Sequence, residues 1–438
     1  YGCLEQKSSK LLGLIGATVI SERFGLATAA EARAPIQPAI DEILAMQRDD
    51  GGFGYWPESS HSSVWGAAYA LSVLARAEQA QTTIQATIPK QAIERAVQFL
   101  REYESSWGSY YFSYETTVNY ALSLHGQDMA SESLALYRKR DHEPLFARAM
   151  LLSTLKLEKT RAQTRSTRLD DAIAQLTKEL TDSLRIEATW AHAEENLHDG
   201  YKVLMHSDDR TTAMVLMALV PTETQHPMVP RLVRWFLLGR KQARYRNTQE
   251  AAWALLGLWD YAERWEKEVP DFEAGVWLGQ QRIVSAMFEG RDAKTHETNL
   301  AMESLATTVG SDATDLVIGK KGTGTRYYVA RLRYARKKLP DAPRDHGFAV
   351  ARRIEVLDAA GDVLKNQRAP KLGDTLLVTV TATAPEARRY VVIDDPIPAG
   401  WEVLDATLAT SSRSFGAKAT RASFYDHREI RADRVLFF

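Results

Sequence analysis

The stretch that decides the fold reads VWGAAYALSVLA and spans residues 64–75. Its apolar side chains recur with the spacing of a helix, at Val64, Ala67, Ala68, Leu71, Leu74 and Ala75. Such spacing predicts a helix with a wide apolar face. Residues 212–219 and 252–259 repeat the pattern, so we expect a chain built from many helices of this kind.

Polar residues that favour helix starts accompany these three stretches. Ser62 precedes the first stretch, and Asp209 precedes the second. Asn247 precedes the third, and Glu250 follows it by three positions, which is the spacing of a capping box. We therefore predict that helices begin at these points.

The helical pattern continues to about residue 266, with roughly twelve expected helices that arrive in pairs about 40 residues apart. Two helices that are apolar over wide faces cannot bury those faces alone, so the pairs must stack on one another. An open solenoid and a closed ring would both achieve this. Because the many Ala side chains allow close packing, we predict a closed ring.

After Pro270 the pattern changes to short runs rich in β-branched residues, bounded by Gly and Pro turns. Such runs predict the strands of β-sandwiches. The expected strands are residues 326–334, 352–356, 376–383, 390–394 and 435–438. Residues 272–287 are ambiguous, and the Pro-containing, charged residues 337–345 predict a linker between two β units.

Composition excludes several classes of protein. The net charge is −1, from 55 basic and 56 acidic residues, so no overall field would hold nucleic acid. With Cys3 as the single cysteine, the chain can form no internal disulfide and no cysteine-rich zinc module. No apolar run approaches the ~18 residues of a transmembrane helix, so we expect a chain that does not span a membrane.

The ten histidines do not indicate a metal site. None of them forms the i, i+4 pair that marks a helix-borne metal site. His192 and His198 lie near Glu194 and Glu195, but six positions separate the two imidazoles, and we expect a solvated helix end there. We therefore predict neither a metal nor a cofactor.

The chain opens with Tyr1-Gly2-Cys3-Leu4-Glu5-Gln6. A Cys and a Gln three positions apart at the start of a helix can bring thiol and carboxamide together on one face. If the sulfur attacks the carboxamide carbon and ammonia leaves, Cys3 and Gln6 form an internal thioester, whose acyl group amines, hydroxyls or water can take. Gly2 would allow a sharp turn before this ring. On these residues alone, a small buried apolar Cys3 remains an open alternative.

The hexapeptide resembles the thioester motif Gly-Cys-x-Glu-Gln of the alpha-2-macroglobulin and complement superfamily. The match is complete at Gly2, Cys3, Glu5 and Gln6. Six further segments resemble parts of this family, several of them in its bacterial members, and they stand in the family's order. They are residues 47–56, 63–65, 209–213, 247–253, 394–402 and 427–435.

The resemblance implies a multidomain α plus β architecture. Residues 1–266 would form the thioester domain, an α/α toroid of about six helical hairpins. Residues 267–338 would form the returning part of a CUB-like β-domain, and residues 345–438 a C-terminal macroglobulin-like β-sandwich. We expect the chain to be the C-terminal piece of a longer bacterial parent.

The resemblance also implies a function. The parent would be a broad-spectrum endopeptidase inhibitor, not an enzyme: a protease cuts its bait region, and the thioester acylates a lysine amine of the trapped protease in a single turnover. Cys3 would be the leaving thiol and Gln6 the acyl donor, while Glu5 either orients the thioester ring or only caps the helix. The implied partners are proteases and the rest of the parent, namely its bait region, CUB and macroglobulin domains. The implied location is the periplasm, with the parent anchored to the inner membrane as a lipoprotein.

Aromatic residues are candidates for shielding the thioester from water. Tyr1 lies two positions from Cys3, and a second group consists of Tyr110, Tyr111, Phe112 and Tyr114. For the second group, hydrophobic packing of a loop is the alternative.

A His of the toroid steers transfer to hydroxyls in the complement-like branch of the family. Residues 108–116, which align with that position, contain no His, and the nearest is His125. We therefore predict that a thioester in this chain prefers amines.

Two other interpretations remain open. One is an α/α-toroid binding module without a live thioester. The other is a terpene cyclase or a protein prenyltransferase, because segments like residues 47–56 occur there too. The chain lacks the Cys and His ligands of a prenyltransferase zinc site. Its acidic pairs, Asp49-Asp50 and Asp208-Asp209, are better interpreted as a turn and a helix cap.

Overall fold

The computed structural model describes most of the chain. The described residues are 2–25, 29–102, 112–141, 143–162, 166–187, 189–195, 207–222, 224–239, 245–291, 295–309, 314–334, 347–385, 391–405, 425 and 427–438. They divide into two compact units, Tyr1–Ala330 and Arg331–Phe438. The domain limits expected at residues 266, 338 and 345 stay predictions.

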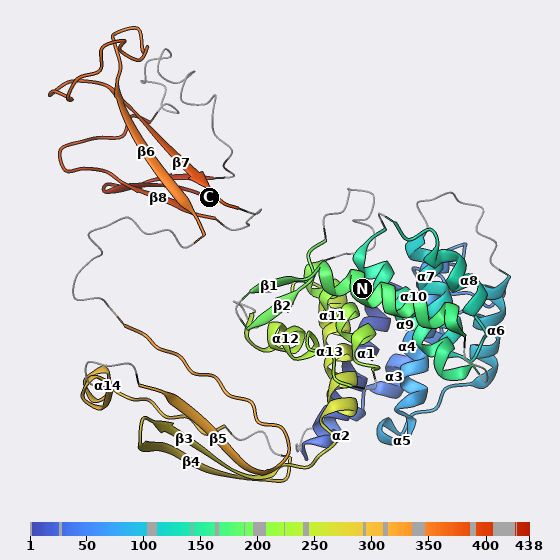
Figure 1. The fold of residues 1–438 in the computed structure, drawn as a ribbon. Helices are drawn as coiled ribbons and strands as arrows, with labels where there is room; N and C mark the ends of the chain where they lie inside the picture. The colour runs from blue at the N-terminus through green and yellow to red at the C-terminus, as the bar shows by residue number, and fades with distance from the viewer. Residues whose placement is uncertain are drawn as a thin grey trace. The chain divides into compact units, whose positions relative to one another are not determined.

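Six long helices of the first unit close into a ring (Figure 1). Each contacts the next along the chain, and the last contacts the first. They are α1 (Leu4–Arg23), α4 (Val64–Gln79), α7 (Phe112–Leu124), α9 (Leu145–Arg161), α11 (Asp208–Leu219) and α13 (Thr248–Trp265). The predicted closed ring, an α/α toroid, is confirmed.

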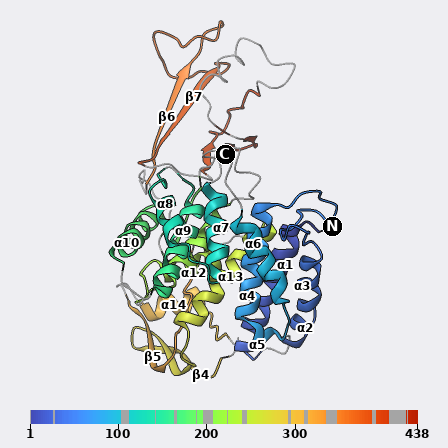
Figure 2. The same cartoon turned by 90° about the vertical axis from the view of Figure 1, so that its right-hand side faces the viewer.

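Other helices pack on the outside of this ring. α3 packs on α1, α6 on α4, α8 and α10 on α9, and α12 on α11 (Figure 2). Their bounds are α2 (Ala29–Arg33), α3 (Ile36–Leu44), α5 (Gln81–Ile84), α6 (Lys90–Arg101), α8 (Ala130–Tyr137), α10 (Thr167–Asp182) and α12 (Val229–Arg234), which the π-helical turn η3 (Trp235–Gly239) continues.

The sequence pattern separates inner helices from outer ones. Every residue of α4 from Trp65 to Leu74 is buried, as expected for a helix enclosed on all sides. In α6, by contrast, the buried residues are Ile93, Ala96 and Leu100, which form a single stripe. The helices with all-round apolar character therefore line the ring, and helices with one apolar stripe cover it.

The inner helices run in the same direction, because their beginnings contact one another. In α1 and α4, Ser9 Oγ lies 2.9 Å from Tyr69 Oη. In α1 and α13, Gln249 Nε2 donates to Glu5 Oε1 over 2.9 Å. We call the end of the ring where these helices begin the N-terminal face.

The ends of the same helices meet at the opposite side of the ring. Arg76 of α4 binds Asp260 of α13 through two hydrogen bonds of 3.0 and 3.1 Å, and it also reaches Tyr120 of α7. Burial raises the pKa of Asp260, and the Arg76 guanidinium opposes that shift. Parallel inner helices therefore follow from contacts at both ends.

Three helix starts show how far the predicted caps hold. Asn247 accepts a hydrogen bond from Glu250 N over 2.9 Å, as the predicted capping box requires. The Glu250 carboxylate accepts from Arg246 N, one residue before the expected donor Asn247 N. α4 is capped by Ser63 rather than by the predicted Ser62, whose hydroxyl instead binds Asp50.

At α11 the predicted cap, Asp209, is also wrong. Ser207 caps this helix through a 3.2 Å hydrogen bond from Arg210 N. Asp209 lies inside the first turn, where its carboxylate accepts from Trp235 Nε1 over 2.8 Å. The side chain of Asp209 is therefore bound to a neighbouring helical segment instead of to its own backbone.

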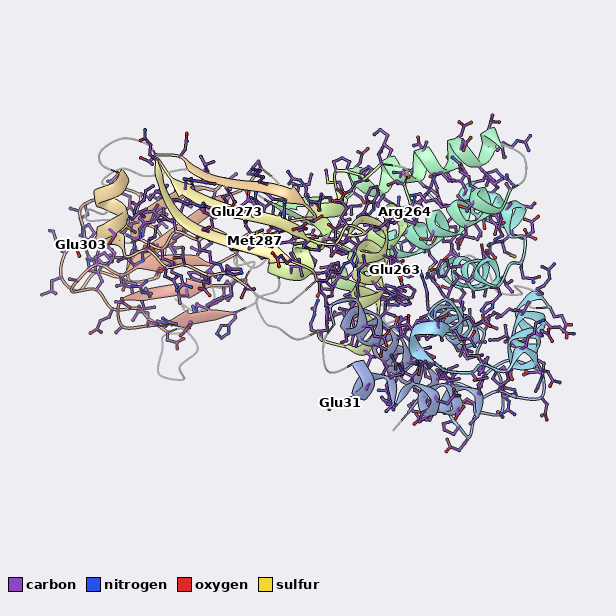
Figure 3. The ribbon with its side chains drawn as sticks, turned by 90° about the horizontal axis from the view of Figure 1, so that it is seen from below. Glu31, Glu263, Arg264, Glu273, Met287 and Glu303 are labelled. Carbon is purple, nitrogen blue, oxygen red and sulfur yellow. The ribbon has the colours of Figure 1, made fainter. Side chains whose placement is uncertain are left out.

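Strands follow the helices in the first unit. β3 (Asp271–Leu278) lies between β4 (Gln281–Glu289) and β5 (Leu316–Thr323) in an antiparallel sheet, and α14 (Met302–Val309) precedes β5. Glu273 and Met287 lie opposite each other in β3 and β4 (Figure 3). The ambiguous residues 272–287 are therefore a hairpin. A shorter hairpin, β1 (Arg185–Glu187) and β2 (Trp190–His192), precedes α11.

The strand expected at residues 326–334 does not form in the described structure. Apolar and polar residues do alternate in this segment, but it pairs with no strand of the described chain. Several of its apolar side chains are exposed, namely Tyr327, Tyr328, Val329, Leu332 and Tyr334.

The second unit consists of two antiparallel sheets. β6 (Ala349–Val356) pairs with β7 (Leu376–Thr383), and β10 (Arg434–Phe437) lies between β8 (Ile393–Pro396) and β9 (Arg428–Ile430). The strands expected at 352–356, 376–383 and 435–438 are confirmed within one residue of their ends or inside longer strands. The run expected at 390–394 begins as a strand only at Ile393, and its Tyr390 lies outside the described residues, as does the expected linker at 337–345.

No helix in the described part of the chain combines the length and the apolar character that crossing a membrane requires.

We expect Gly66→Ala to destabilise the ring. An added Cβ would lie 2.9 Å from Leu4 Cδ2 and 3.0 Å from Ser63 Oγ, where α1 approaches the start of α4. Overpacking of this kind costs about 1–3 kcal/mol. Chemical denaturation followed by far-ultraviolet circular dichroism measures the change.

Gly16→Ala is the matched control for this substitution. Its Cβ would meet Leu255 Cβ at an ordinary 3.6 Å. Replacing Gly by Ala inside a helix should then stabilise by about 0.5–1 kcal/mol. Equal effects of the two substitutions would contradict the close approach of α1 and α4.

Candidate functional site

Cys3 and Gln6 occupy paired positions at the start of α1. Cys3 is the residue before the first helical turn and has an extended backbone, and its side chain accepts no capping hydrogen bond. Gln6 is the third residue of the helix. In a capping box the side chain at each of these two positions reaches the backbone N–H of the other residue, so both side chains lie at the same end of the helix. Helix geometry therefore permits contact between thiol and carboxamide, while the thioester itself stays a prediction.

The two residues differ in exposure. The side chain of Cys3 is only 5% exposed, whereas Gln6 is exposed. Burial of the sulfur keeps water from one half of the predicted bond, and Gln6 is open to an incoming nucleophile.

Gly2 provides space rather than an unusual backbone angle. It does not belong to the glycines with positive φ. A Cβ at this position would lie 2.8 Å from Lys7 Cε. The Lys7 ammonium binds Glu42 at 3.2 Å, which fixes the side chain against Gly2. Gly2 therefore packs closely against Lys7, and the sharp turn expected at Gly2 stays a prediction.

Tyr55 lies beside the sulfur, although sequence reasoning gave it no role in the site. Its carbonyl oxygen accepts from Leu4 N over 2.9 Å, which joins the loop before α4 to the start of α1. Burial raises the pKa of Tyr55 above its usual range, and the neighbouring Cys3 adds to the shift. The signal in the sequence was the run Gly-Gly-Phe-Gly-Tyr at residues 51–55.

Two of the five shielding candidates can be placed. Phe112 is buried at the start of α7. Tyr114, two residues further, packs against the core, and its phenol also contributes to the raised pKa of Tyr55. Tyr114 therefore lies near Tyr55 and hence near Cys3. Tyr1, Tyr110 and Tyr111 lie outside the described residues. Shielding by any of them stays a prediction.

Glu5 is buried and binds residues of α1 and α13. It is 1% exposed, and its Oε1 atom accepts hydrogen bonds from Ser9 Oγ, Thr248 Oγ1 and Gln249 Nε2. Thr248 and Gln249 are the first two residues of α13. Glu5 therefore binds the beginning of the last inner helix, a partner 243 positions away that no local pattern could indicate.

Further buried polar groups surround Glu5 at the N-terminal face. Trp253 Nε1 donates to Gln249 Oε1 over 2.9 Å, and the Trp253 ring stacks on Tyr69. Burial lowers the pKa of Arg210 to about 10, against the opposing effect of Tyr69, Glu195 and Glu5 nearby. Burial raises the pKa of Glu195, which accepts from two backbone amides at the start of α9.

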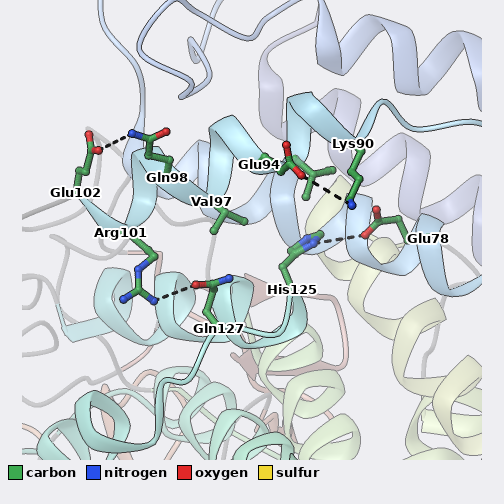
Figure 4. Close-up of a pocket in the computed structure, with 10 residues that line it drawn as sticks. Glu78, Lys90, Glu94, Val97, Gln98, Arg101, Glu102, His125 and Gln127 are labelled. Atoms are coloured by element: carbon green, nitrogen blue, oxygen red, sulfur yellow. Dashed lines mark hydrogen bonds and ion pairs between the residues drawn. The ribbon is translucent and has the colours of Figure 1, made fainter.

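His125 lies against Glu78 of α4 (Figure 4). Its Nε2 atom lies 3.0 Å from the carbonyl oxygen of Leu71, and its Nδ1 atom lies 3.4 Å from the Glu78 carboxylate. Leu71 and Glu78 lie five and twelve positions beyond Gly66, roughly 8 to 18 Å along α4 from the point where Leu4 packs. Both ring nitrogens are therefore engaged far from Gln6.

The solvated helix end expected at His192 is wrong. His192 ends strand β2, is buried, and stacks on the Trp235 ring with centroids 4.2 Å apart. His198 lies outside the described residues. No group of three or more metal-binding side chains occurs among the residues that the structure describes.

The acidic pairs that a cyclase would need have structural roles. Asp50 accepts from Gly52 N and from the Ser62 hydroxyl, which confirms the turn. Asp208 accepts from Glu195 N at the start of α11. These carboxylates are engaged within the fold.

Two protein families match parts of the chain. Residues 1–137 match the A-macroglobulin TED domain, and residues 347–438 match the bacterial alpha-2-macroglobulin MG10 domain. The first match contains Cys3, Gln6 and Tyr55, and the second coincides with the two sheets of the second unit.

Similar curated proteins are alpha-2-macroglobulins. The homolog from Nostoc sp. is 22% identical over 453 residues, which cover 99% of this chain and 22% of the relative. The Escherichia coli protein is 25% identical over 431 residues, which cover 94% of this chain and 23% of the relative. The chain thus spans less than a quarter of the length of either relative.

The solved structures that resemble the chain include trypsin-activated alpha-2-macroglobulin from Escherichia coli. Its TM-score is 0.52 at 20% identity, and the match covers 100% of this chain and 28% of that one. The elastase-activated form of the same protein gives 0.49 at 19% identity, covering 100% and 37%. The first of these likenesses supports the fold.

We expect the Tyr55 ring to cover the Cys3 sulfur. Tyr55→Ala should speed labelling of the free thiol by a thiol reagent about tenfold or more, because exposure governs thiol reactivity. Tyr55→Phe, which keeps the ring, should change it much less. The labelling rate is measured after methylamine treatment, so that every molecule carries an open thiol.

Trp56→Ala is the control for this measurement. The Trp56 ring contacts Tyr55 edge-on at 5.7 Å but is half exposed. Its removal should leave the labelling rate nearly unchanged. A Tyr55→Ala variant that is labelled as slowly as the unmodified chain would show that other side chains bury the sulfur.

Proposed function

The chain belongs to the alpha-2-macroglobulin family, and on that premise we propose that it carries the covalent conjugation step of a bacterial broad-spectrum protease inhibitor. The single observation that carries the proposal is the placement of Cys3 before α1 and of Gln6 at its third position. That placement allows a thioester between the two side chains within the region that matches the TED domain.

In the proposed chemistry Cys3 supplies the sulfur and Gln6 supplies the acyl carbon, and each reacts in a single turnover. Ring closure joins Cys3 Sγ to the Gln6 carboxamide carbon and releases ammonia. In conjugation, an amine attacks that carbon, the carbon–sulfur bond breaks, and a proton from the amine ends on the sulfur. The products are a stable amide at Gln6 and a free thiol at Cys3. Because nothing restores the thioester, the protein acts as a single-turnover inhibitor and not as an enzyme.

The N-terminal face suits a leaving thiolate. Helices α1 and α13 begin there, so the positive ends of their dipoles point toward this region. A negative charge that develops on the sulfur of Cys3, directly before α1, is stabilised by the first-turn amides of that helix. The fold therefore helps the bond to break once a nucleophile attacks.

The partners in this proposal are proteases and other parts of a longer parent. The Escherichia coli relative is described in forms activated by trypsin and by elastase. By analogy, we propose that cleavage of a bait region elsewhere in the parent exposes the thioester to lysine amines. We also propose a periplasmic location and a lipoprotein anchor, which the resemblance implies, and no cofactor.

A second candidate function rests on the exposure of Gln6. A side chain open to solvent beside a buried sulfur fits a ring-shaped binding module whose thioester is never closed. Intact mass separates the two functions, because ring closure lowers the mass by one ammonia. A freshly purified chain whose intact mass equals the mass calculated from its sequence, with no ammonia lost, would favour the binding module.

Cys3→Ser should abolish covalent labelling by amines without harming the fold. Serine at this position can accept from the first-turn amides of α1, where the sulfur makes no capping hydrogen bond. A serine cap stabilises a helix by about 0.5–2 kcal/mol relative to a residue without a cap. Mass spectrometry with methylamine measures labelling, and thermal unfolding measures stability.

Cys3→Ala serves as the control, since it removes the thiol without adding a cap. It should also abolish labelling, at equal or slightly lower stability than the unmodified chain. If either variant still took up methylamine, another residue would carry the acyl group.

A surviving thioester should prefer amines to hydroxyls. A neutral amine attacks a thioester unaided, whereas a hydroxyl needs a base to remove its proton. Labelling should speed up as the pH rises, because alkyl amines of pKa about 10.4 are mostly protonated near neutrality. Competition between methylamine and glycerol, read by mass, tests the preference.

His125→Ala tests whether the histidine nearest in sequence to residues 108–116 takes part. We expect the ratio of amide to ester to stay the same, since both ring nitrogens of His125 are bound elsewhere. A glycerol ester that predominates in the unmodified chain and disappears in this variant would contradict both expectations.

A further inference from the structure

Glu5 joins the first inner helix to the last one. It belongs to the same turn of α1 as Gln6, and we call that turn, with Cys3 before it, the reacting turn. All three of its hydrogen bonds end on one oxygen: Ser9 Oγ at 2.7 Å, and Thr248 Oγ1 and Gln249 Nε2 at 2.9 Å each. Gln249 also donates to Ser9 Oγ over 3.2 Å. Glu5 and Ser9 belong to α1, whereas Thr248 and Gln249 belong to α13. The carboxylate thus forms a cross-helix latch.

A latch of this kind is costly to bury. A carboxylate loses its hydration when it leaves water, and hydrogen bonds and nearby positive charge must compensate for that loss. Glu5 is 1% exposed, and the groups that compensate are the three donors, the start of α13 and the nearby Arg210. A glutamate whose only role is to cap its own helix can do so at the surface. The burial of Glu5 therefore indicates a role beyond capping.

The other end of α1 is tied to α13 as well. The Arg23 guanidinium, in the last turn of α1, donates to the Glu266 carbonyl oxygen just after α13. Between the two ends, Gly13 and Gly16 of α1 pack against Leu255 of α13. The helix is therefore fixed along its length, and Glu5 is the contact nearest to the reacting side chains.

We propose that Glu5 is a positioning residue: by binding the start of α13 it fixes the rotation of the first turn of α1, and with it the direction in which Cys3 and Gln6 face. This inference rests on the proposed thioester. Among the described residues, the hydrogen bonds of Glu5 go to Ser9, Thr248 and Gln249 and not to Cys3 or Gln6, so it acts through the turn to which those two residues belong.

Small rotations of that turn are enough to matter. Side-chain atoms lie about 5–6 Å from a helix axis, so a rotation of roughly 10–20° moves them by about 1–2 Å. A displacement of about 1 Å between reacting groups can cost about a hundredfold in rate. Losing the latch should therefore weaken ring closure far more than it weakens the fold.

Four variants separate positioning from stability. Glu5→Ala removes the latch, and Thr248→Val removes one donor from the opposite helix at constant size. Glu5→Gln keeps an acceptor oxygen of the same reach and should rescue function. Ser8→Ala is the matched control in the same turn, because Ser8 is buried and its hydroxyl has no partner in the described structure.

The first measurement is the closed fraction of freshly purified chain by intact mass, together with its rate of methylamine uptake. We expect Glu5→Ala to lose about tenfold or more in closed chain, and Thr248→Val to lose several-fold. Glu5→Gln and Ser8→Ala should stay within about twofold of the unmodified chain, with thermal unfolding recorded for all four. If Glu5→Ala folds and closes like the unmodified chain, the inference is wrong.

The second measurement needs no thioester and covers the case in which Glu5→Ala fails to fold. Amide hydrogen exchange of the first turn of α1 is compared in Thr248→Val and Ser8→Ala. We expect faster exchange in Thr248→Val alone, and equal exchange in the two would overturn the inference. An unmodified chain that never shows the closed mass would instead remove the proposed function, and exchange would still decide the role of Glu5.

Discussion

Closure of the helix ring between α1 and α13 is the interaction on which the rest of the first unit depends. Inner helices that are apolar on every side cannot face water, so the row of helices must close on itself. The closing helices are far apart in sequence, and Leu255 of α13 packs against Gly13 and Gly16 of α1. An open row would leave both of these surfaces exposed.

Because the inner helices of the closed ring are parallel, their beginnings all lie at the N-terminal face. This explains why charged side chains are buried at that face. The first amides of a helix have no partners within it, and the positive end of its dipole favours negative groups. Glu5 and Glu195 supply the carboxylates for α13 and α9, while Arg210 offsets part of their charge. The buried cluster is therefore a consequence of the ring, and the reacting turn of α1 lies beside it.

Local patterns predicted what is local. Helical spacing at residues 64–75 identified an inner helix, and the positions of Cys3 and Gln6 relative to a helix start followed from three residues of separation. Partners far apart in sequence could not be predicted, as Glu5 with Thr248 shows. A period-two pattern failed at residues 326–334, because alternation gives the faces of a strand but not a neighbour with which to pair. His192 failed for a similar reason, since its stacking partner Trp235 belongs to another element.

The latch at the N-terminal face also constrains how the sequence can change over time. No local rule connects Glu5 with Thr248, yet the exposed Thr248 hydroxyl donates to the buried Glu5 carboxylate. A hydrophobic replacement of Thr248 leaves that carboxylate with one donor fewer, and a poorly satisfied buried polar group costs about 1–3 kcal/mol. Substitutions at these two distant positions should therefore be inherited together, with the first turn of α1 and the first turn of α13 varying as one unit.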